Sequence, residues 1–183
     1  IDAVGLMPLY AYQRLSAGEL RRINWSKEES IKPLVISDDN KEQLRIEIKF
    51  NRRNYIVSFY IIEANGIPVI LAYQPDILTE LYPYDPERIK QCAFMGKVFV
   101  ELFKALGKAP DIVRLNEPHL LFVEVARQNE IESCAQEGRR SIYAKTQAIL
   151  TSHSPDKYLY PVYNSIDWLK NQIGCEMIPG WIV

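Results

Sequence analysis

The nine residues DIVRLNEPH, Asp111–His119, carry the change from strand to helix that decides the fold. Asp111–Leu115 is a short apolar stretch entered after a proline, which favours a strand. Pro118 suits the first position of a helix, because its missing N–H has no partner there, so we expect a helix over Pro118–Glu130. The residues of this helix that we expect to face inward are Leu121, Phe122, Val125 and Ala126. The segment therefore predicts a strand, a polar turn and a helix in direct succession.

A longer helix is expected before this segment. Asp85-Pro86 places an N-cap residue ahead of a proline. Apolar residues then recur at three- and four-residue steps, ending near a glycine, Gly107. The recurring residues are Ile89, Cys92, Ala93, Gly96, Phe99, Val100, Phe103 and Leu106. After the central segment we expect a further helix in Glu137–Lys145, a strand over Gln147–Thr151 and a last helix over Tyr163–Gln172.

The first third of the chain reads as β-rich. Glu42–Phe50 alternates apolar and charged residues with the period of a half-exposed strand. Pro68–Tyr73 is apolar almost throughout, as in a strand buried on both faces. The expected elements, in order, are a short edge strand in Gly5–Gln13, strands over Glu42–Phe50 and Tyr55–Glu63 with a turn at Asn51–Asn54, a turn at Asn65-Gly66, and the strand over Pro68–Tyr73.

The second half therefore alternates as β–α–β–α–β, which predicts an α/β class with a Rossmann-like parallel sheet and helices on both faces. We expect residues 1–183 to form a single, incomplete lobe, with a β-rich hairpin part over 1–75 and an α/β part over 76–183. Ligands of such sheets bind beyond the carboxyl ends of the strands. Both histidines of the chain follow predicted strands, His119 after Leu115 and His153 after Thr151.

Composition argues against a nucleic-acid-binding protein and against a membrane protein. The 22 Lys and Arg against 23 Asp and Glu give a net charge of −1, so we expect no broad basic surface for nucleic acid. The longest apolar runs are shorter than the ~20 residues of a membrane span, so no membrane partner is expected. Three scattered cysteines without CxxC spacing indicate free thiols and a cytoplasmic location. The chain begins at Ile1 without a leader, and we expect it to be cut from a longer protein.

Asn116-Glu117-Pro118-His119 and Thr151-Ser152-His153-Ser154 are the candidate site motifs. Their structural alternatives are a helix N-cap at Asn116 with Glu117 in a first helical turn, and a hydroxyl-rich turn around His153. A metal site is disfavoured, because the ligands would come from separate loops without an HExxH spacing. No GxSxG and no Gly-rich phosphate loop is present.

Three blocks of the chain resemble the α-glucan phosphorylases, the pyridoxal-phosphate family of glycogen, starch and maltodextrin phosphorylase. They are LYPYD followed by ERIKQ (residues 81–91), LNEPH (residues 115–119) and LTSHSP (residues 150–155). The resemblance covers Ile67–Asp156 and departs from the family pattern at Cys92, at Pro118 and after Pro155. It implies part of the N-terminal lobe of a two-lobed glycosyltransferase-B (GT-B) fold, with the cofactor's lysine in the absent C-terminal lobe.

The resemblance also implies an activity and residue roles. The reaction would be reversible phosphorolysis of α-1,4-glucan to glucose 1-phosphate, with this fragment alone inactive. His153 would hold the transferred glucosyl unit through its O6 side, and Asp85 would lie in the loop that gates the site. Asn116 belongs to the substrate-binding motif, in which Glu117 and His119 would line the acceptor side. Partners would be α-glucan and phosphate, with a homo-oligomer possible.

Two other functions stay open. A nucleotide-sugar glycosyltransferase such as a glycogen synthase shares the two-lobed fold and the glucan substrate. Those enzymes tend to show HxHDW at the corresponding turn, whereas this chain has Asn116-Glu117-Pro118-His119. The third reading is a lobe that binds glucan without turnover.

Overall fold

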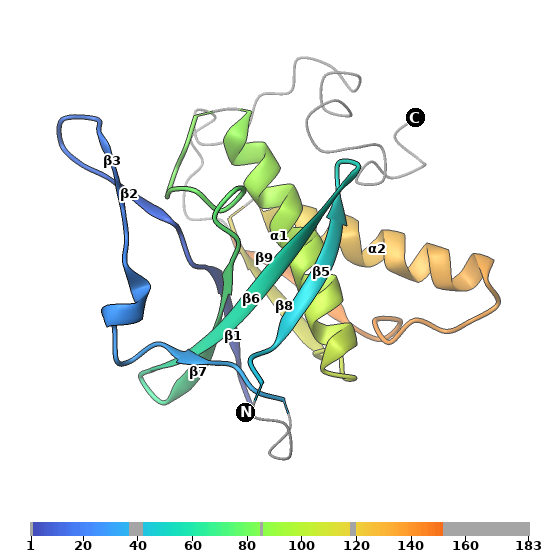
Figure 1. The fold of residues 1–183 in the computed structure, drawn as a ribbon. Helices are drawn as coiled ribbons and strands as arrows, with labels where there is room; N and C mark the ends of the chain where they lie inside the picture. Colours follow the sequence, from blue (N-terminus) through green and yellow to red (C-terminus); the bar gives the residue numbers. More distant parts are fainter. Residues whose placement is uncertain (1, 37–41, 85, 118–119, 152–183) are drawn as a thin grey trace. The chain divides into compact units, whose positions relative to one another are not determined.

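The computed structural model describes residues 2–36, 42–84, 86–117 and 120–151 (Figure 1). Its residues fall into two compact units. Unit 1 comprises 1–48 and 55–83, and unit 2 comprises 49–54 and 84–183. The predictions at Asp85, His119 and His153 and for a helix over Tyr163–Gln172 lie outside the described residues.

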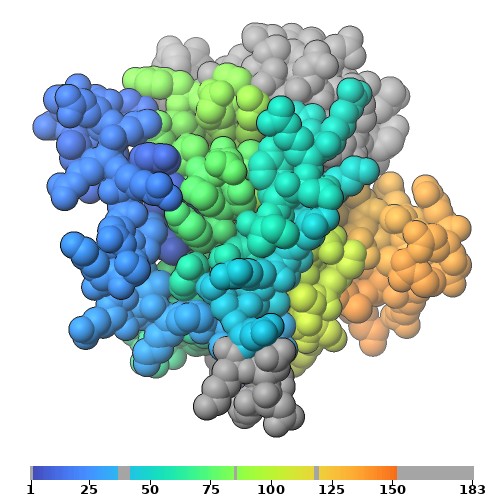
Figure 2. All heavy atoms as spheres, in the orientation of Figure 1, coloured from blue at the N-terminus to red at the C-terminus, as the bar shows by residue number. Residues whose placement is uncertain are grey.

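A five-stranded sheet organises unit 1. The strand order is β1 (Gly5–Pro8), β7 (Ile67–Tyr73), β6 (Arg53–Ala64) and β4 (Lys32–Pro33), and β5 (Arg45–Phe50) also pairs with β6. β1 runs parallel to β7, whereas β4 and β7 run antiparallel to β6. β2 (Tyr12–Arg14) and β3 (Leu20–Arg22) form a separate hairpin, followed by the short 3-10 helix η1 (Trp25–Lys27). Residues 13–22 are exposed throughout and form part of the blue surface in Figure 2.

Both predicted hairpin turns are confirmed. Asn51 and Arg52 join β5 to β6 with φ of 45° and 63°, and Asn65 and Gly66 join β6 to β7 with φ of 53° and 77°. Positive φ at both central residues is the mark of the type I′ turn, whose twist matches that of paired strands. The predicted alternation is also confirmed, because Ile48 and Phe50 of β5 are buried while its charged residues Arg45, Glu47 and Lys49 are exposed.

The apolar strand β7 is buried as predicted. Val69–Ala72 are all below 9% exposed, and β7 lies between β1 and β6 in the sheet. β1 is an edge strand, as expected around Pro8, because a proline cannot donate to a neighbouring strand.

Helix α1 (Glu87–Ala105) is the central element of unit 2. Its buried residues extend almost all round its axis, and they include seven of the eight positions of the predicted apolar stripe, with Leu106 half-buried. The sequence predicts Pro86 as the first helical residue. In the structure Pro86 is the N-cap, so the helix begins one residue later, at Glu87. It ends at Ala105, close to Gly107 as predicted, and the φ of 70° at Gly107 suits a glycine after a helix.

Helix α2 (Leu121–Gln136) crosses α1 closely at Gly96. A Cβ built on Gly96 would lie 2.3 Å from the Phe122 carbonyl oxygen, so only a glycine fits. The predicted inward face is partly wrong, because Leu121 is 43% exposed while Val123 is buried. The helix begins three residues later than expected, and the backbone contact at Phe122 turns Phe122, Val123 and Ala126 inward instead.

The predicted helix over Glu137–Lys145 is wrong, because α2 ends before it and turns follow. Gly138, with φ of 70°, donates to the Ala135 carbonyl at 3.0 Å, and the next N–H donates to the Cys134 carbonyl at 2.8 Å. This pair of bonds is the Schellman motif that terminates helices. Tyr143 then anchors the loop, because its fully buried hydroxyl donates to the Val100 carbonyl of α1 at 2.7 Å.

The strands at either end of α2 pair as predicted. β8 (Ile112–Asn116) and β9 (Gln147–Thr151) are parallel neighbours with α2 between them in the chain. The α/β class with parallel strands is thus confirmed. Within the described residues β8 and β9 form a two-stranded sheet, whereas β7 belongs to the five-stranded sheet. The alternating strands therefore do not share one continuous hydrogen-bonded sheet.

Candidate functional site

The candidate site lies at the carboxyl ends of β8 and β9. The two strands are in register up to their last residues, Asn116 opposite Thr151. The Glu117 N–H then donates to the Thr151 carbonyl at 2.8 Å, which extends the pairing by one bond. Asn116 and Thr151 therefore lie side by side at the same edge of this strand pair. The two candidate motifs therefore start next to each other, as the sequence predicts.

Glu117 holds an unusual backbone conformation. Its φ is 81°, in the left-handed region that glycine favours, and its side chain is half-buried. Its carbonyl accepts from the Leu120 N–H at 3.1 Å, which closes a tight turn into α2. A non-glycine residue in this region costs about 1–2 kcal/mol, and such strain is concentrated at functional sites. Glu117 is therefore strained among the described residues that follow β8.

Asn116 faces away from the interior. Leu115 is 3% exposed and anchors β8, so the pleat places Asn116 and Arg114 on the opposite, exposed face. The Arg114 Nε donates to the Thr151 Oγ1 at 3.1 Å across the strand pair. The cap position of α2 is Leu120, without a side-chain hydrogen bond, so Asn116 is not the N-cap of the helix. The structural alternative of Asn116 as the cap of α2 is therefore wrong.

Three of the predicted site residues, Asp85, His119 and His153, lie outside the described residues. Their convergence with Glu117 on one concavity stays a prediction. Before Asp85, the tyrosines of the LYPYD block are strongly exposed, with Tyr82 at 68% and Tyr84 at 82%. Tyr82 also has a positive φ of 55°.

Arg127 ties α2 to the loop that leads to β9. The buried guanidinium of Arg127 donates to both carboxylate oxygens of Glu124, at 2.6 and 2.8 Å, and to the Tyr143 carbonyl at 3.1 Å. Burial by itself raises the pKa of Glu124, but hydrogen bonds from Arg127 and Gln128 outweigh it and hold the pKa below its usual range. The donors and acceptors of this network satisfy one another, so we interpret it as a structural contact between α2 and the loop at Tyr143.

Unit 1 contains a concavity that was not predicted. Its volume is about 500 Å³. The lining residues are Leu9, Arg22, Ile23, Asn24, Trp25, Ser26, Tyr60 and Tyr73. Local sequence patterns gave no signal for it, because its aromatic residues come from η1, β6 and β7.

No group of three or more His, Cys, Asp and Glu in the described residues is arranged to hold a metal ion. None of the helices in the described ranges combines the length and the apolar character that crossing a bilayer requires.

Comparison with known proteins bears on the fold. No family model and no curated protein matches the chain. Among solved structures, the chain is similar to the catalytic domain of starch synthase IV from Arabidopsis thaliana, bound to ADP and acarbose. The TM-score is 0.53 at 16% identity, over 81% of this chain and 26% of that one. This chain thus spans about a quarter of that structure's length. The similarity shows a mixed α/β fold like part of a GT-B glycosyltransferase.

Proposed function

We propose that this chain forms part of the glucan-holding lobe of a GT-B glycosyltransferase that acts on α-1,4-glucan. The observation that carries the proposal is the parallel pairing of β8 and β9 up to Asn116 and Thr151, where both candidate motifs begin, with Glu117 in a strained conformation directly after Asn116. The GT-B-like fold supports it independently, because it is the fold on which glucan-acting transferases are built.

The strand-end residues have the chemistry that a sugar needs. A carboxylate accepts hydrogen bonds from two hydroxyls, and a carboxamide both donates and accepts. Glu117 and Asn116 would thus orient an acceptor glucan at the sheet edge. By resemblance, His119 would stand beside them, His153 would hold the transferred glucosyl unit, and Asp85 would gate the site. Correct placement of these groups matters because glucosyl transfer develops positive charge at the anomeric carbon.

The first candidate donor is a nucleotide sugar. The supporting observation is that the structural neighbour is a starch synthase domain solved with ADP. In this case the lobe would present the glucan end to the activated sugar, and the nucleotide would be released.

The second candidate is phosphorolysis, supported by the residues LNEPH (115–119), LTSHSP (150–155) and ERIKQ (87–91). Phosphate would then be the nucleophile and glucose 1-phosphate the product. Pyridoxal phosphate would supply a phosphate group that helps to move the proton. The resemblance puts its lysine in a C-terminal lobe, so we assign no residue of this chain to the cofactor.

Turnover assays with the complete protein encoded by the gene separate the candidates. Maltohexaose is supplied either with phosphate, measuring glucose 1-phosphate, or with ADP-glucose, measuring ADP release. Glu117→Gln, which keeps the size of the side chain, should lower turnover by about tenfold or more, since it removes a charge-assisted hydrogen bond. Exposed Arg45 of β5 offers a matched control, and Arg45→Ala should match the parent.

The outcomes are distinct. Activity with one donor supports the corresponding candidate, and glucan binding without turnover supports a non-catalytic lobe. Absence of both turnover and glucan binding would contradict the proposal. A cytoplasmic location and a homo-oligomer remain predictions, which fractionation and light scattering can check.

A further inference from the structure

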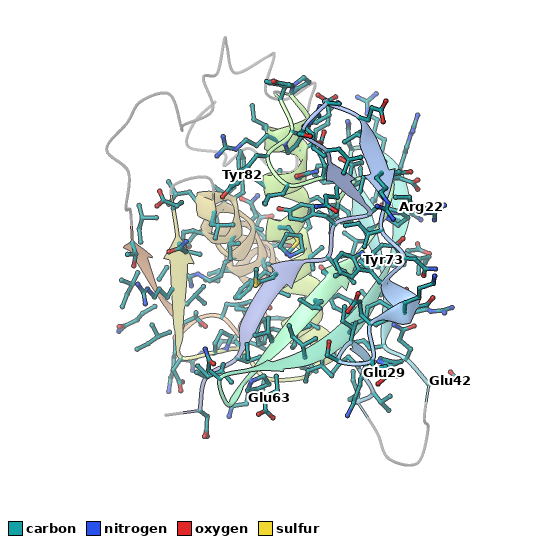
Figure 3. All side chains as sticks on the ribbon, turned by 90° about the vertical axis from the view of Figure 1, so that its left-hand side faces the viewer. Arg22, Glu29, Glu42, Glu63, Tyr73 and Tyr82 are labelled. Carbon is teal, nitrogen blue, oxygen red and sulfur yellow. The ribbon has the colours of Figure 1, made fainter. Side chains whose placement is uncertain are left out.

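The cavity of unit 1 has a composition distinct from its surroundings. Trp25, Tyr60 and Tyr73 line it together with Leu9, and Arg22 is its one charged lining residue. Its volume of about 500 Å³ lies within the ~300–1,000 Å³ of ligand pockets. Figure 3 shows Arg22 and Tyr73 on the same side of unit 1. The cavity thus combines a large aromatic surface with a single cation.

Strands β6 and β7 supply the tyrosines that line the cavity of unit 1. Tyr60 lies opposite Leu71 and Tyr73 opposite Ser58, so both tyrosines project from the same face of the sheet. Their rings contact edge to face, with centroids 6.4 Å apart and planes at 81°. Beneath them, Leu9 and Leu71 belong to a buried apolar cluster against which the tyrosines and Trp25 pack. The aromatic groups are therefore held in place before any ligand arrives.

The opposite wall is the segment between β3 and η1. The Ile23 N–H donates to the Ala11 carbonyl at 2.9 Å, and the Trp25 indole N–H donates to the Tyr10 carbonyl at 2.7 Å. Because the indole N–H is already bonded, Trp25 offers a ligand its apolar ring. Asn24 accepts from the Ser26 N–H and hydroxyl through its Oδ1, which leaves its amide N–H groups for a ligand.

Polar groups around this wall remain available. The guanidinium of exposed Arg22 makes no hydrogen bond or ion pair with any residue in the described ranges. The hydroxyls of Tyr60 and Tyr73 likewise have no hydrogen-bond partner within the part of the chain that the structure describes. The cavity therefore offers flat apolar faces beside several hydrogen-bonding groups.

These features fit a sugar better than a nucleotide. A planar base stacks in a slot between parallel rings, whereas Tyr60 and Tyr73 are nearly perpendicular. A pyranose chair is thicker and carries C–H bonds on both faces, so it can contact both rings of such a corner. A guanidinium has only N–H donors, which sugar hydroxyls can accept, while a nucleoside diphosphate carries more negative charge than this one cation balances. The choice of α-glucan among sugars rests on the proposed function.

We propose that this cavity is a second, non-catalytic binding site for a short stretch of α-glucan, separate from the strand-end turn. One glucosyl unit stacks in the corner of Tyr60 and Tyr73, and Arg22 and Asn24 donate to its hydroxyls. Such a site retains a long polymer by raising the effective concentration of chain ends near the enzyme.

The test is a titration of the 183-residue chain with maltohexaose, followed by NMR at the indole N–H signal of Trp25, assigned with Trp25→Phe. This signal reports the cavity alone. Arg22→Ala should weaken the binding seen at Trp25 by about tenfold. Arg21→Ala is the matched control, because Arg21 is equally exposed on β3 but does not line the cavity, and it should bind like the parent.

Each outcome decides the matter. A maltohexaose-dependent shift that Arg22→Ala weakens and Arg21→Ala leaves unchanged supports the site, even where the complete protein shows no turnover. Binding that responds to Glu117→Gln but never to Arg22→Ala supports the strand-end site and overturns this one. Equal effects of Arg21→Ala and Arg22→Ala, or a Trp25 signal that responds to ADP and not to maltohexaose, would also overturn it.

Discussion

Replacing Glu117 by glycine and by alanine measures the strain at the strand-end turn. Both changes remove the side chain and its interactions, so their difference isolates the backbone. Alanine at a φ of 81° pays about 1–2 kcal/mol for the left-handed conformation, while glycine does not. Glycine loses about 0.4–1 kcal/mol through the greater freedom of its unfolded chain. We therefore expect Glu117→Gly to unfold with a free energy about 1 kcal/mol higher than Glu117→Ala.

The same pair of changes at Arg114, in the regular part of β8, is the matched control. There the φ is not positive, so glycine keeps only its entropic disadvantage, and Arg114→Gly should be less stable than Arg114→Ala by about 0.5–1 kcal/mol. Urea unfolding followed by circular dichroism gives all four values. The same order at both positions, with alanine the more stable, would refute the strain at Glu117.

Two more predictions concern the packing behind the site. Gly96→Ala should lower the free energy of unfolding by about 2–3 kcal/mol, because the new Cβ would meet the Phe122 backbone, which cannot rotate away. Gly107 has open space around it, so Gly107→Ala, the control, should lower the free energy of unfolding by only about 1 kcal/mol. Equal losses for the two variants would contradict the close helix crossing. The ion pair of Glu124 with Arg127 depresses the pKa of the carboxyl, so its stabilisation is present above the ordinary carboxyl pKa and is lost as the pH falls through the folded-state pKa. Glu124→Gln should therefore lower stability at neutral pH and flatten its decline in acid, and an unchanged pH profile would contradict this assignment.

Local signals in the sequence predicted much of the fold. The turns at Asn51-Arg52 and Asn65-Gly66 follow from residues that tolerate positive φ or suit turns, and the burial of β7 follows from its unbroken apolar run. The pairing of β8 with β9 followed from their alternation with α2. Each of these features depends on a few neighbouring residues.

The errors arose where distant contacts or a single residue decide the structure. Gly138 lies inside the range predicted as a further helix, Glu137–Lys145, and its positive φ ends α2 instead of allowing a new helix there. The inward face of α2 depends on its contact with Gly96, some 26 residues earlier, which periodicity alone does not reveal. The division of strands between two sheets is likewise a non-local property.

The candidate site divides in the same way. The placement of Asn116 and Thr151 at neighbouring strand ends was predictable from alternation, and their pairing confirms it, whereas a binding site at this edge stays a prediction. The strain at Glu117 was not predictable, because glutamate carries no preference for positive φ. The unit 1 cavity was invisible in the sequence, since sheet pairing brings Tyr60 and Tyr73 beside a loop that precedes them by dozens of residues.

The most direct test of the glucan-holding site is backbone amide NMR of the chain during titration with maltohexaose. The Glu117 amide is bonded to the Thr151 carbonyl at the level where both motif-bearing turns begin, so it reports a ligand at this edge. We predict saturable shifts at Asn116, Glu117 and Thr151 that Glu117→Gln reduces. Glucan binding that leaves these three signals unchanged, or no glucan binding at all, would contradict the site at the ends of β8 and β9.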